Sequence, residues 1–145
     1  MKKGVDYIGV GVSYYCHDGN GNYVMNKRSL NCRDEHGCWD FGGGGIDIND
    51  TVDETLRKEL KEEYGVENIE YKFLGYRDAF REQNGEMTHW LQLHFVVKVD
   101  PKEVKNGEPH KFDAVEWFTL DKLPEPLHSQ ALVQLELFKE NLPRK

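Results

Sequence analysis

The sequence lacks any long hydrophobic run. None of its apolar stretches approaches the roughly 18 consecutive residues that a transmembrane helix requires. The first residues, from Met1 to Asp6, contain no apolar segment of the kind found in a secretory signal. These two absences predict a cytoplasmic protein that does not bind membranes.

Cysteine is scarce. The chain has three cysteines, Cys16, Cys32 and Cys38, and an odd number without a secretory signal indicates reduced thiols, not a disulfide framework. Cys32, His36 and Cys38 could bind zinc in principle, but their spacing matches no common zinc finger and a fourth ligand is missing. We therefore expect thiols in a loop or partly buried.

Positive charge is in deficit. The 19 lysines and arginines are outnumbered by 26 aspartates and glutamates, which gives a net charge of −7. This balance disfavours a protein that binds nucleic-acid polymers through a basic patch. It does not exclude small phosphate ligands, because an acidic site can bind phosphates through divalent cations.

The composition otherwise fits one globular unit. A chain of 145 residues with 38% hydrophobic residues can bury a core without disulfides or metals. No repeat, low-complexity tract or Pro/Ser-rich linker divides it. We therefore expect a single domain over residues 1–145.

The pattern of residues predicts strands and two helices. Asn84-Gly85 is a strong hairpin sequence, and Gly65 is placed to end a helix. Ser129 can cap a last helix whose Leu132, Leu135 and Phe138 share one face. The expected strands cover residues 7–15, 23–27, 70–81, 87–99 and 115–118, and the first helix covers 51–64. Hairpins combined with two helices predict an α/β fold with a mixed sheet between helices.

Three carboxylates flank the apolar stripe of the first predicted helix. At about 100° per residue, Glu59, Glu62 and Glu63 lie beside the stripe and not opposite it. Carboxylates beside a buried stripe repel one another and are costly to desolvate, so they favour cations such as Mg²⁺ or Mn²⁺. Glutamate-rich surface helices are also common, so this pattern alone leaves both interpretations open. The stripe consists of Val52, Leu56, Leu60 and Tyr64.

Four glycines, Gly42 to Gly45, come shortly before this helix. Glycine backbone can adopt positive φ and approach a ligand closely, and its carbonyls can join a metal shell. A flexible surface loop is the alternative. The proximity of the glycines to the carboxylates favours a binding site.

Together these residues resemble the Nudix box, G-x5-E-x7-R-E-U-x-E-E-x-G-U, in which U is an apolar aliphatic residue. The corresponding run keeps every spacing and reads Gly44-x5-Asp50-x7-Lys58-Glu59-Leu60-x-Glu62-Glu63-x-Gly65-Val66. The preceding Trp39-x-Phe41-x-Gly43-Gly44 is similar to the lead-in common in that family. The order of the predicted elements is also similar, so the resemblance implies the family's α/β/α sandwich, with a catalytic helix and a C-terminal helix.

Three positions depart from the family pattern. Asp50 keeps the charge of the usual glutamate with a shorter side chain, and it could also cap the helix. Lys58 replaces an arginine whose bidentate fork it cannot reproduce, although a single contact with Glu62 is feasible at i, i+4 spacing. Gly42 replaces a proline and should loosen the loop. We interpret these changes as slowing or tuning the chemistry.

The resemblance implies a metal-dependent enzyme that hydrolyses a phosphoanhydride bond in a nucleoside diphosphate derivative. It implies Mg²⁺ or Mn²⁺ bound by Glu59, Glu63 and the Gly44 carbonyl, with Glu62 as a third ligand or as the group that orients the nucleophile. Lys58 stands at the position of the catalytic helix's arginine, and Glu108 resembles a loop glutamate that reaches over the metals. An exposed loop acid is the alternative for Glu108, and the general base stays open.

A (deoxy)nucleoside triphosphate, cleaved to monophosphate and pyrophosphate, is the substrate that we favour. A nucleoside diphosphate sugar, coenzyme A, or a non-catalytic nucleotide-binding module are the alternatives, and a monomer or a homodimer is expected. Substrate contacts are predicted for phosphate-binding cations and for aromatic side chains that could instead serve core packing. They are Lys27, Arg28, Arg33, Trp90 and Phe112.

Overall fold

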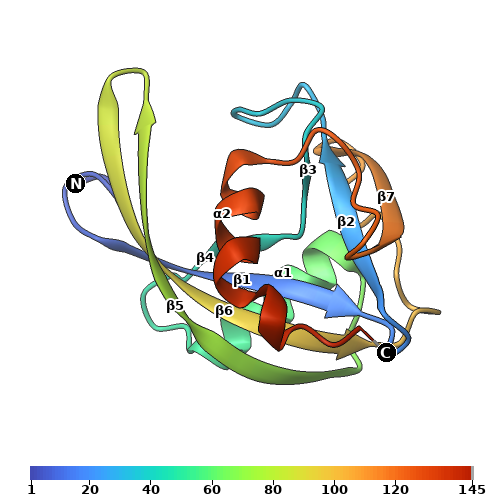
Figure 1. Cartoon of the computed structure of the whole chain (residues 1–145). Coiled ribbons are helices and arrows are strands. Elements are labelled where there is room, and N and C mark those ends of the chain that lie inside the picture. The colour runs from blue at the N-terminus through green and yellow to red at the C-terminus, as the bar shows by residue number, and fades with distance from the viewer. Residues whose placement is uncertain (145) are drawn as a thin grey trace.

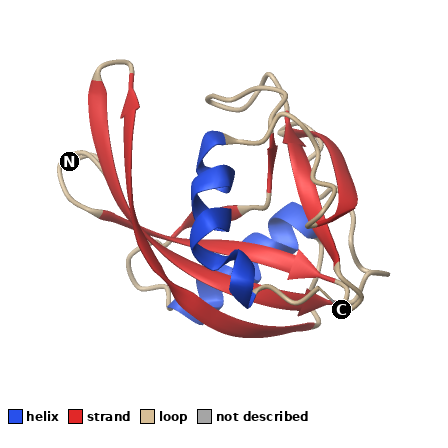
Figure 2. Cartoon of the chain, viewed as in Figure 1, coloured by secondary structure: helices blue, strands red, loops and turns tan. Residues whose placement is uncertain are grey.

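A mixed β-sheet separates two helices in the computed structural model, which describes residues 1–144 (Figures 1 and 2). The strand order is β3-β2-β1-β6-β5; in addition, β4 pairs with β1 and β7 pairs with β2. β1 and β6 run parallel and the other pairs are antiparallel. The predicted α/β/α sandwich is confirmed. The strands are β1 (Gly9–His17), β2 (Asn22–Arg28), β3 (Trp39–Asp40), β4 (Gly43–Gly45), β5 (Ile69–Gln83), β6 (Glu86–Val99) and β7 (Phe112–Thr119).

β5 and β6 are the longest strands of the sheet and form a hairpin. The turn end of this hairpin projects beyond the two helices (Figure 1). It turns at Asn84 and Gly85, whose φ values of 52° and 78° match the positive φ that an Asn-Gly hairpin turn requires. Residues of both strands near this turn, at the end of β5 and the start of β6, form one wall of an open cavity.

Helix α1 (Val52–Tyr64) covers one face of the sheet. Thr51 caps its start, since its side chain accepts a hydrogen bond from the Glu54 amide at 3.0 Å. Gly65 ends it with φ 73°, as predicted. The cap expected of Asp50 is therefore wrong by one residue, because the helix begins one position later.

The buried face of α1 consists of Leu56, Leu60 and Tyr64, which pack against Val12 and Tyr14 of β1. This confirms most of the predicted stripe. Val52 does not belong to it, because it lies at the open end of the helix and is 37% exposed.

Helix α2 (Ser129–Phe138) covers the other face and is followed by the short 3₁₀ helix η1 (Lys139–Asn141). His128, and not Ser129, caps it, because the His128 Nδ1 accepts from the Gln130 amide at 3.0 Å. Leu135 and Phe138 are buried as expected, whereas Leu132 is 55% exposed and Gln134 takes the inward position. Neither helix of residues 1–144 is long and apolar enough to cross a bilayer.

Candidate active site

Glu63 lies almost completely buried at the end of α1, beside the glycine strand β4. Its Oε1 accepts hydrogen bonds from the Tyr14 hydroxyl and from the Gly43 amide, the latter at 3.2 Å. Both hydrogen bonds that the structure gives this side chain use the same oxygen. The carboxylate is therefore held in one orientation by β1 and β4, with Oε2 left available.

Glu59 lies one turn earlier on α1 and contacts the backbone of Gly44. A Cβ atom at Gly44 would come within 2.3 Å of the Glu59 carboxyl carbon, and one at Gly42 would come within 2.6 Å of the Glu63 Oε1. Side chains at these positions would displace the carboxylates. Gly43 to Gly45 thus form a strand and not the flexible loop that was the alternative interpretation, and Gly42 and Gly44 let both glutamates pack against main chain.

The electrostatics of this pair indicate a shortage of positive charge. Burial raises the pKa of Glu59 to about 7, and the charges of Glu62 and Glu108 add to the shift. Burial also raises the pKa of Glu63; its hydrogen bond from Tyr14 opposes the shift, while the charge of Glu59 adds to it. Carboxylates that repel in this way are stabilised by a cation.

Glu108 approaches from the loop that follows β6. This loop is fixed to the end of α1 by two backbone hydrogen bonds, Lys105 N to Tyr64 O at 3.0 Å and Gly107 N to Glu63 O at 2.9 Å. A Cβ at Gly107 would lie 2.1 Å from the Glu62 carbonyl oxygen, so the close contact needs glycine there. The Glu108 side chain is 19% exposed, and its charge acts on both Glu59 and Glu63.

Lys58 and Glu62 occupy the outer side of the same helix. The Lys58 Nζ lies 4.0 Å from Asp47, in the loop before α1, and makes no ion pair with Glu62 in the described part of the chain. The contact expected at i, i+4 spacing is therefore wrong, because the flexible lysine meets another carboxylate. Glu62 is exposed to solvent.

A cavity of about 370 Å³ opens beside Glu63 and the glycine strand. Of the predicted substrate residues, Arg28, Arg33, Trp90 and Phe112 line it, whereas Lys27 is not among the lining residues. Phe112 is also part of the buried core, with its ring stacked on Tyr64 at 6.4 Å. The Trp90 ring covers the backbone of Gly4, Gly9 and Gly45.

Sequence analysis missed the polar residues of the far wall. Arg77 and Arg81 of β5 line the cavity together with Gln130 and Gln134 of α2. The alternation of Arg77, Ala79, Arg81 and Gln83 along β5 places four polar or small residues on one face, and this period of two could have identified the strand part of the wall.

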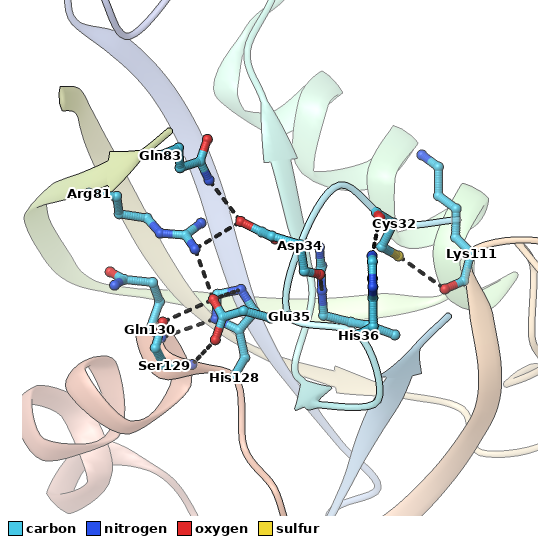
Figure 3. Close-up of polar contacts among 11 residues, drawn as sticks. Cys32, Asp34, Glu35, His36, Arg81, Gln83, Lys111, His128, Ser129 and Gln130 are labelled. Carbon is cyan, nitrogen blue, oxygen red and sulfur yellow. Dashed lines mark hydrogen bonds and ion pairs between the residues drawn. The ribbon is translucent and has the colours of Figure 1, made fainter. Parts of the chain in front are cut away.

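A second cluster joins the loop before β3 to the hairpin and to α2 (Figure 3). The Arg81 Nη2 bridges Asp34 at 3.0 Å and Glu35 at 2.8 Å, and His128 Nε2 lies 2.9 Å from Glu35. Glu35 also accepts hydrogen bonds from the amide and hydroxyl of Ser129. Arg28 provides a further ion pair to Asp34 at 3.0 Å.

Asp34, Glu35 and His128 are the one group of three potential metal ligands in residues 1–144 whose ligand atoms lie within 4.8 Å of one another. Arg28 and Arg81 already compensate these acids, so the group serves as a clamp between segments. The carboxylates of α1 do not meet this distance criterion in residues 1–144.

The three cysteines are free thiols, as predicted. Cys32 donates from its Sγ to the Lys111 carbonyl at 3.2 Å, and His36 Nε2 lies 2.6 Å from the Cys32 carbonyl oxygen (Figure 3). Both side chains therefore contact backbone.

Comparison with known proteins identifies the fold and its family. A family model of the NUDIX domain matches residues 8–138. The chain is 30% identical over 125 residues to the NAD-capped RNA hydrolase NudC of Pseudomonas aeruginosa, covering 86% of this chain and 41% of that protein. It is 28% identical over 111 residues to the nucleoside triphosphatase NudI of an Enterobacter species, covering 72% of this chain and 77% of that protein.

The comparison with solved structures gives the same family. The crystal structure of a MutT NUDIX hydrolase from Burkholderia pseudomallei matches with a TM-score of 0.77 and 29% identity, covering 90% of this chain and 97% of that one. The chain spans about half the length of several of the curated relatives that it matches.

Proposed function

The chain belongs to the Nudix family, and from this premise we propose that it hydrolyses a phosphoanhydride bond in a nucleoside diphosphate derivative. The substrate that we propose is a (deoxy)nucleoside triphosphate, cleaved to the monophosphate and pyrophosphate. The reaction uses Mg²⁺ or Mn²⁺.

One observation carries this proposal: Glu59 and Glu63 lie against the backbone of the glycines, with Glu63 at the cavity, and burial raises the pKa of both carboxyl groups. No salt bridge within residues 1–144 involves either carboxylate. Hard carboxylate and carbonyl oxygens suit Mg²⁺ and Mn²⁺, so this donor set fits the metal that the family requires. When bound, such a cation would neutralise phosphate oxygens and activate water.

The residues of the chain have distinct parts in this proposal. Tyr14 and Gly43 hold the Glu63 carboxylate by one oxygen, so that the other can act as a ligand. Glu59 and the Gly44 carbonyl are the other two proposed metal ligands. Glu62, exposed on the outer side of α1, serves as a third ligand or orients the attacking water.

Glu108 reaches the same site from the loop after β6, whereas the other carboxylates come from α1. Its loop is attached to the end of α1 by backbone hydrogen bonds of Lys105 and Gly107, and its charge acts on both Glu59 and Glu63. In the proposal it contributes a further carboxylate to the metals or accepts a proton from water. Lys58, close to Asp47, balances part of the negative charge around Glu59.

The triphosphate substrate is supported by the nucleoside triphosphatase among the relatives and by the arginines of the cavity. Arg28 and Arg33 are the phosphate contacts that we propose near the cavity mouth, and Trp90 offers an aromatic surface to the rest of the nucleotide. Phosphoryl transfer depends mainly on positioning and on charge neutralisation, which this arrangement supplies.

A substrate screen tests the proposal. The purified chain is incubated with Mg²⁺ or Mn²⁺ and nucleoside triphosphates, nucleotide sugars or coenzyme A, and released pyrophosphate and nucleotide products are quantified. We expect metal-dependent release of pyrophosphate from a nucleoside triphosphate, with most of this release lost in Glu63→Gln. Preferred cleavage of a nucleotide sugar or of coenzyme A would replace the substrate, and no hydrolysis of any compound would overturn the enzymatic proposal.

A further inference from the structure

Arg77 is a partly buried cation without a carboxylate partner. Four arginines line the cavity: Arg28, Arg33, Arg77 and Arg81. Arg28 and Arg81 form ion pairs with Asp34 and Glu35, and Arg33 is exposed to solvent. Arg77 alone is partly removed from solvent and makes no ion pair in residues 1–144.

The hydrogen bonds of Arg77 are also incomplete. Its Nη1 donates to Gln130 Oε1 at 3.0 Å, which ties the guanidinium to the first turn of α2. Its Nε is buried and has no hydrogen-bond partner within residues 1–144. A buried Nε–H without a hydrogen bond costs free energy that an added acceptor can recover.

The electrostatic environment of Arg77 also favours binding of an anion. Burial lowers its pKa, Tyr15 opposes the shift, and the cation of Arg81 lowers the pKa further. No carboxylate is among these influences, although the chain carries a net charge of −7. The site is therefore prepared for an anion, and the planar fork of arginine matches phosphate oxygens.

The sheet register separates Arg77 from the carboxylates of α1. Gly45 pairs with Gly11, Gly11 with Gln92, and Gln92 with Arg77, so the row crosses three strand spacings. At about 4.8 Å per spacing, the backbone of Arg77 lies roughly 14 Å from that of Gly45. Since Gly44 is where Glu59 packs, Arg77 reaches a different part of a bound ligand than the metal ligands do.

We propose that Arg77 determines specificity by binding an oxygen of the terminal phosphate of the substrate, the group that is linked to the nucleoside diphosphate in a triphosphate. This inference rests on the proposed function and deepens it. Arg77 selects substrates in which the nucleoside diphosphate is linked to a charged phosphate, as in a nucleoside triphosphate, over those in which it is linked to a neutral sugar. Gln130 is the positioning residue that aims the guanidinium.

The first experiment compares kcat/KM for a nucleoside triphosphate and for a nucleoside diphosphate hexose in wild type, Arg77→Gln and Arg77→Lys. We expect Arg77→Gln to lose about tenfold or more on the triphosphate, mainly through KM, and to stay within about twofold of wild type on the hexose. Arg77→Lys should keep part of the preference, because it retains the charge but not the fork. The matched control is Arg57→Gln, which removes an arginine that pairs with Asp53 on the exposed side of α1 and should change neither value.

The second experiment needs no catalysis. Binding of inorganic pyrophosphate to metal-free protein is measured by calorimetry in EDTA, and thermal melting verifies that each variant is folded. We expect wild type and Arg57→Gln to bind equally and Arg77→Gln to bind about tenfold more weakly. Equal affinities of wild type and Arg77→Gln, or no binding by wild type, would overturn the inference.

The two experiments separate this inference from the proposed function. Equal losses of Arg77→Gln on both substrates would overturn the specificity role while hydrolysis itself stands. If wild type hydrolyses neither substrate, the proposed function fails, and the pyrophosphate measurement alone decides whether Arg77 binds phosphate.

Discussion

The Tyr14 hydroxyl donates a hydrogen bond to the Glu63 carboxylate in the interior of the protein, between β1 and α1. The two residues are 49 positions apart in sequence, and each is buried. The Gly43 amide donates to the same oxygen. The orientation of the proposed metal ligand therefore depends on three separate segments, and this dependence leads to the first prediction.

Tyr14→Phe should weaken metal binding without unfolding the protein. Removal of the hydroxyl leaves Glu63 with one of its two donors, so the carboxylate loses part of its fixed orientation. We expect the affinity for Mn²⁺, measured by electron paramagnetic resonance, to fall by about tenfold. Tyr71→Phe is the matched control, because Tyr71 also donates to a carboxylate of α1, that of the exposed Asp53. A wild-type affinity in Tyr14→Phe would show that this hydrogen bond does not position the ligand.

In metal-free protein, ionisation of Glu59 should make a contribution that lowers stability as the pH rises from about 4.5 to about 7. The pKa of Glu59 is raised to about 7 in the folded state, so folding favours its protonated form, and ionisation through this window opposes folding. Glu59→Gln should flatten the dependence and gain about 1–2 kcal/mol at pH 7, after allowance for solvent screening. Denaturant unfolding in EDTA at several pH values measures this pH dependence of stability. The control is Glu54→Gln, which changes an exposed carboxylate of the same helix. Parallel pH curves for Glu59→Gln and wild type would contradict the assigned environment of Glu59.

His94 should make the fold sensitive to acid. It is fully buried between Tyr15 and Phe138, neither ring nitrogen has a partner within residues 1–144, and burial lowers its pKa to about 3. Since the unfolded state takes up a proton on His94 below about pH 6.5 and the folded state does not, the contribution of neutral His94 to stability is complete above that pH and is lost as the pH decreases towards 3.

The variant His94→Phe tests this directly. The variant keeps an aromatic ring in the same stack and removes the titration. The change in its free energy of unfolding between pH 6.5 and pH 5 should therefore be about 1–2 kcal/mol smaller than that of wild type. Thermal or denaturant unfolding across this range is the measurement. Substitution of the exposed His110 by Phe should leave the wild-type dependence unchanged. An unchanged slope in His94→Phe would mean that other groups cause the acid sensitivity.

Glu108→Ala should lower kcat by ten- to a thousandfold, the scale of one lost proton-transfer or charge-stabilising group. Its melting temperature should barely change, because the loop is fixed by backbone hydrogen bonds of Lys105 and Gly107 and not by this side chain. Activity over a Mg²⁺ titration is the measurement, with Glu116→Ala, an exposed acid of β7, as control. Wild-type activity in Glu108→Ala would leave only the helix carboxylates at the metals.

Much of this architecture follows from local sequence. Asn84-Gly85 predicts the hairpin turn because only a few residue types tolerate positive φ at both positions, and Gly65 predicts the helix end for the same reason. The spacing of Glu59 and Glu63 predicts their shared side of α1 because helical periodicity is fixed. The caps were each wrong by one residue, at Asp50 and Ser129, since neighbouring residues offer similar cap side chains.

The rest depends on long-range pairing that no local pattern contains. Gly43 to Gly45 form a strand only because β1 offers them a partner, and Lys58 turns to Asp47 because the loop before α1 brings that carboxylate close. The place of Arg77 in the cavity wall follows from the register of β5 on β6 and from the position of α2. These contacts were outside the reach of residue spacing and composition.

The central claim is that the buried carboxylates of α1 bind the catalytic metal, and the turnover of Glu63→Gln at saturating Mg²⁺ tests it most directly. The substitution keeps the shape of the side chain and removes one repulsive charge from a site that burial and Glu59 make unfavourable for ionisation. We expect hydrolysis of the nucleoside triphosphate to fall by at least about a hundredfold, while the metal-free melting temperature stays equal or rises. Near wild-type turnover at saturating Mg²⁺ would contradict the assignment of Glu63 as a metal ligand, and with it the account of this site.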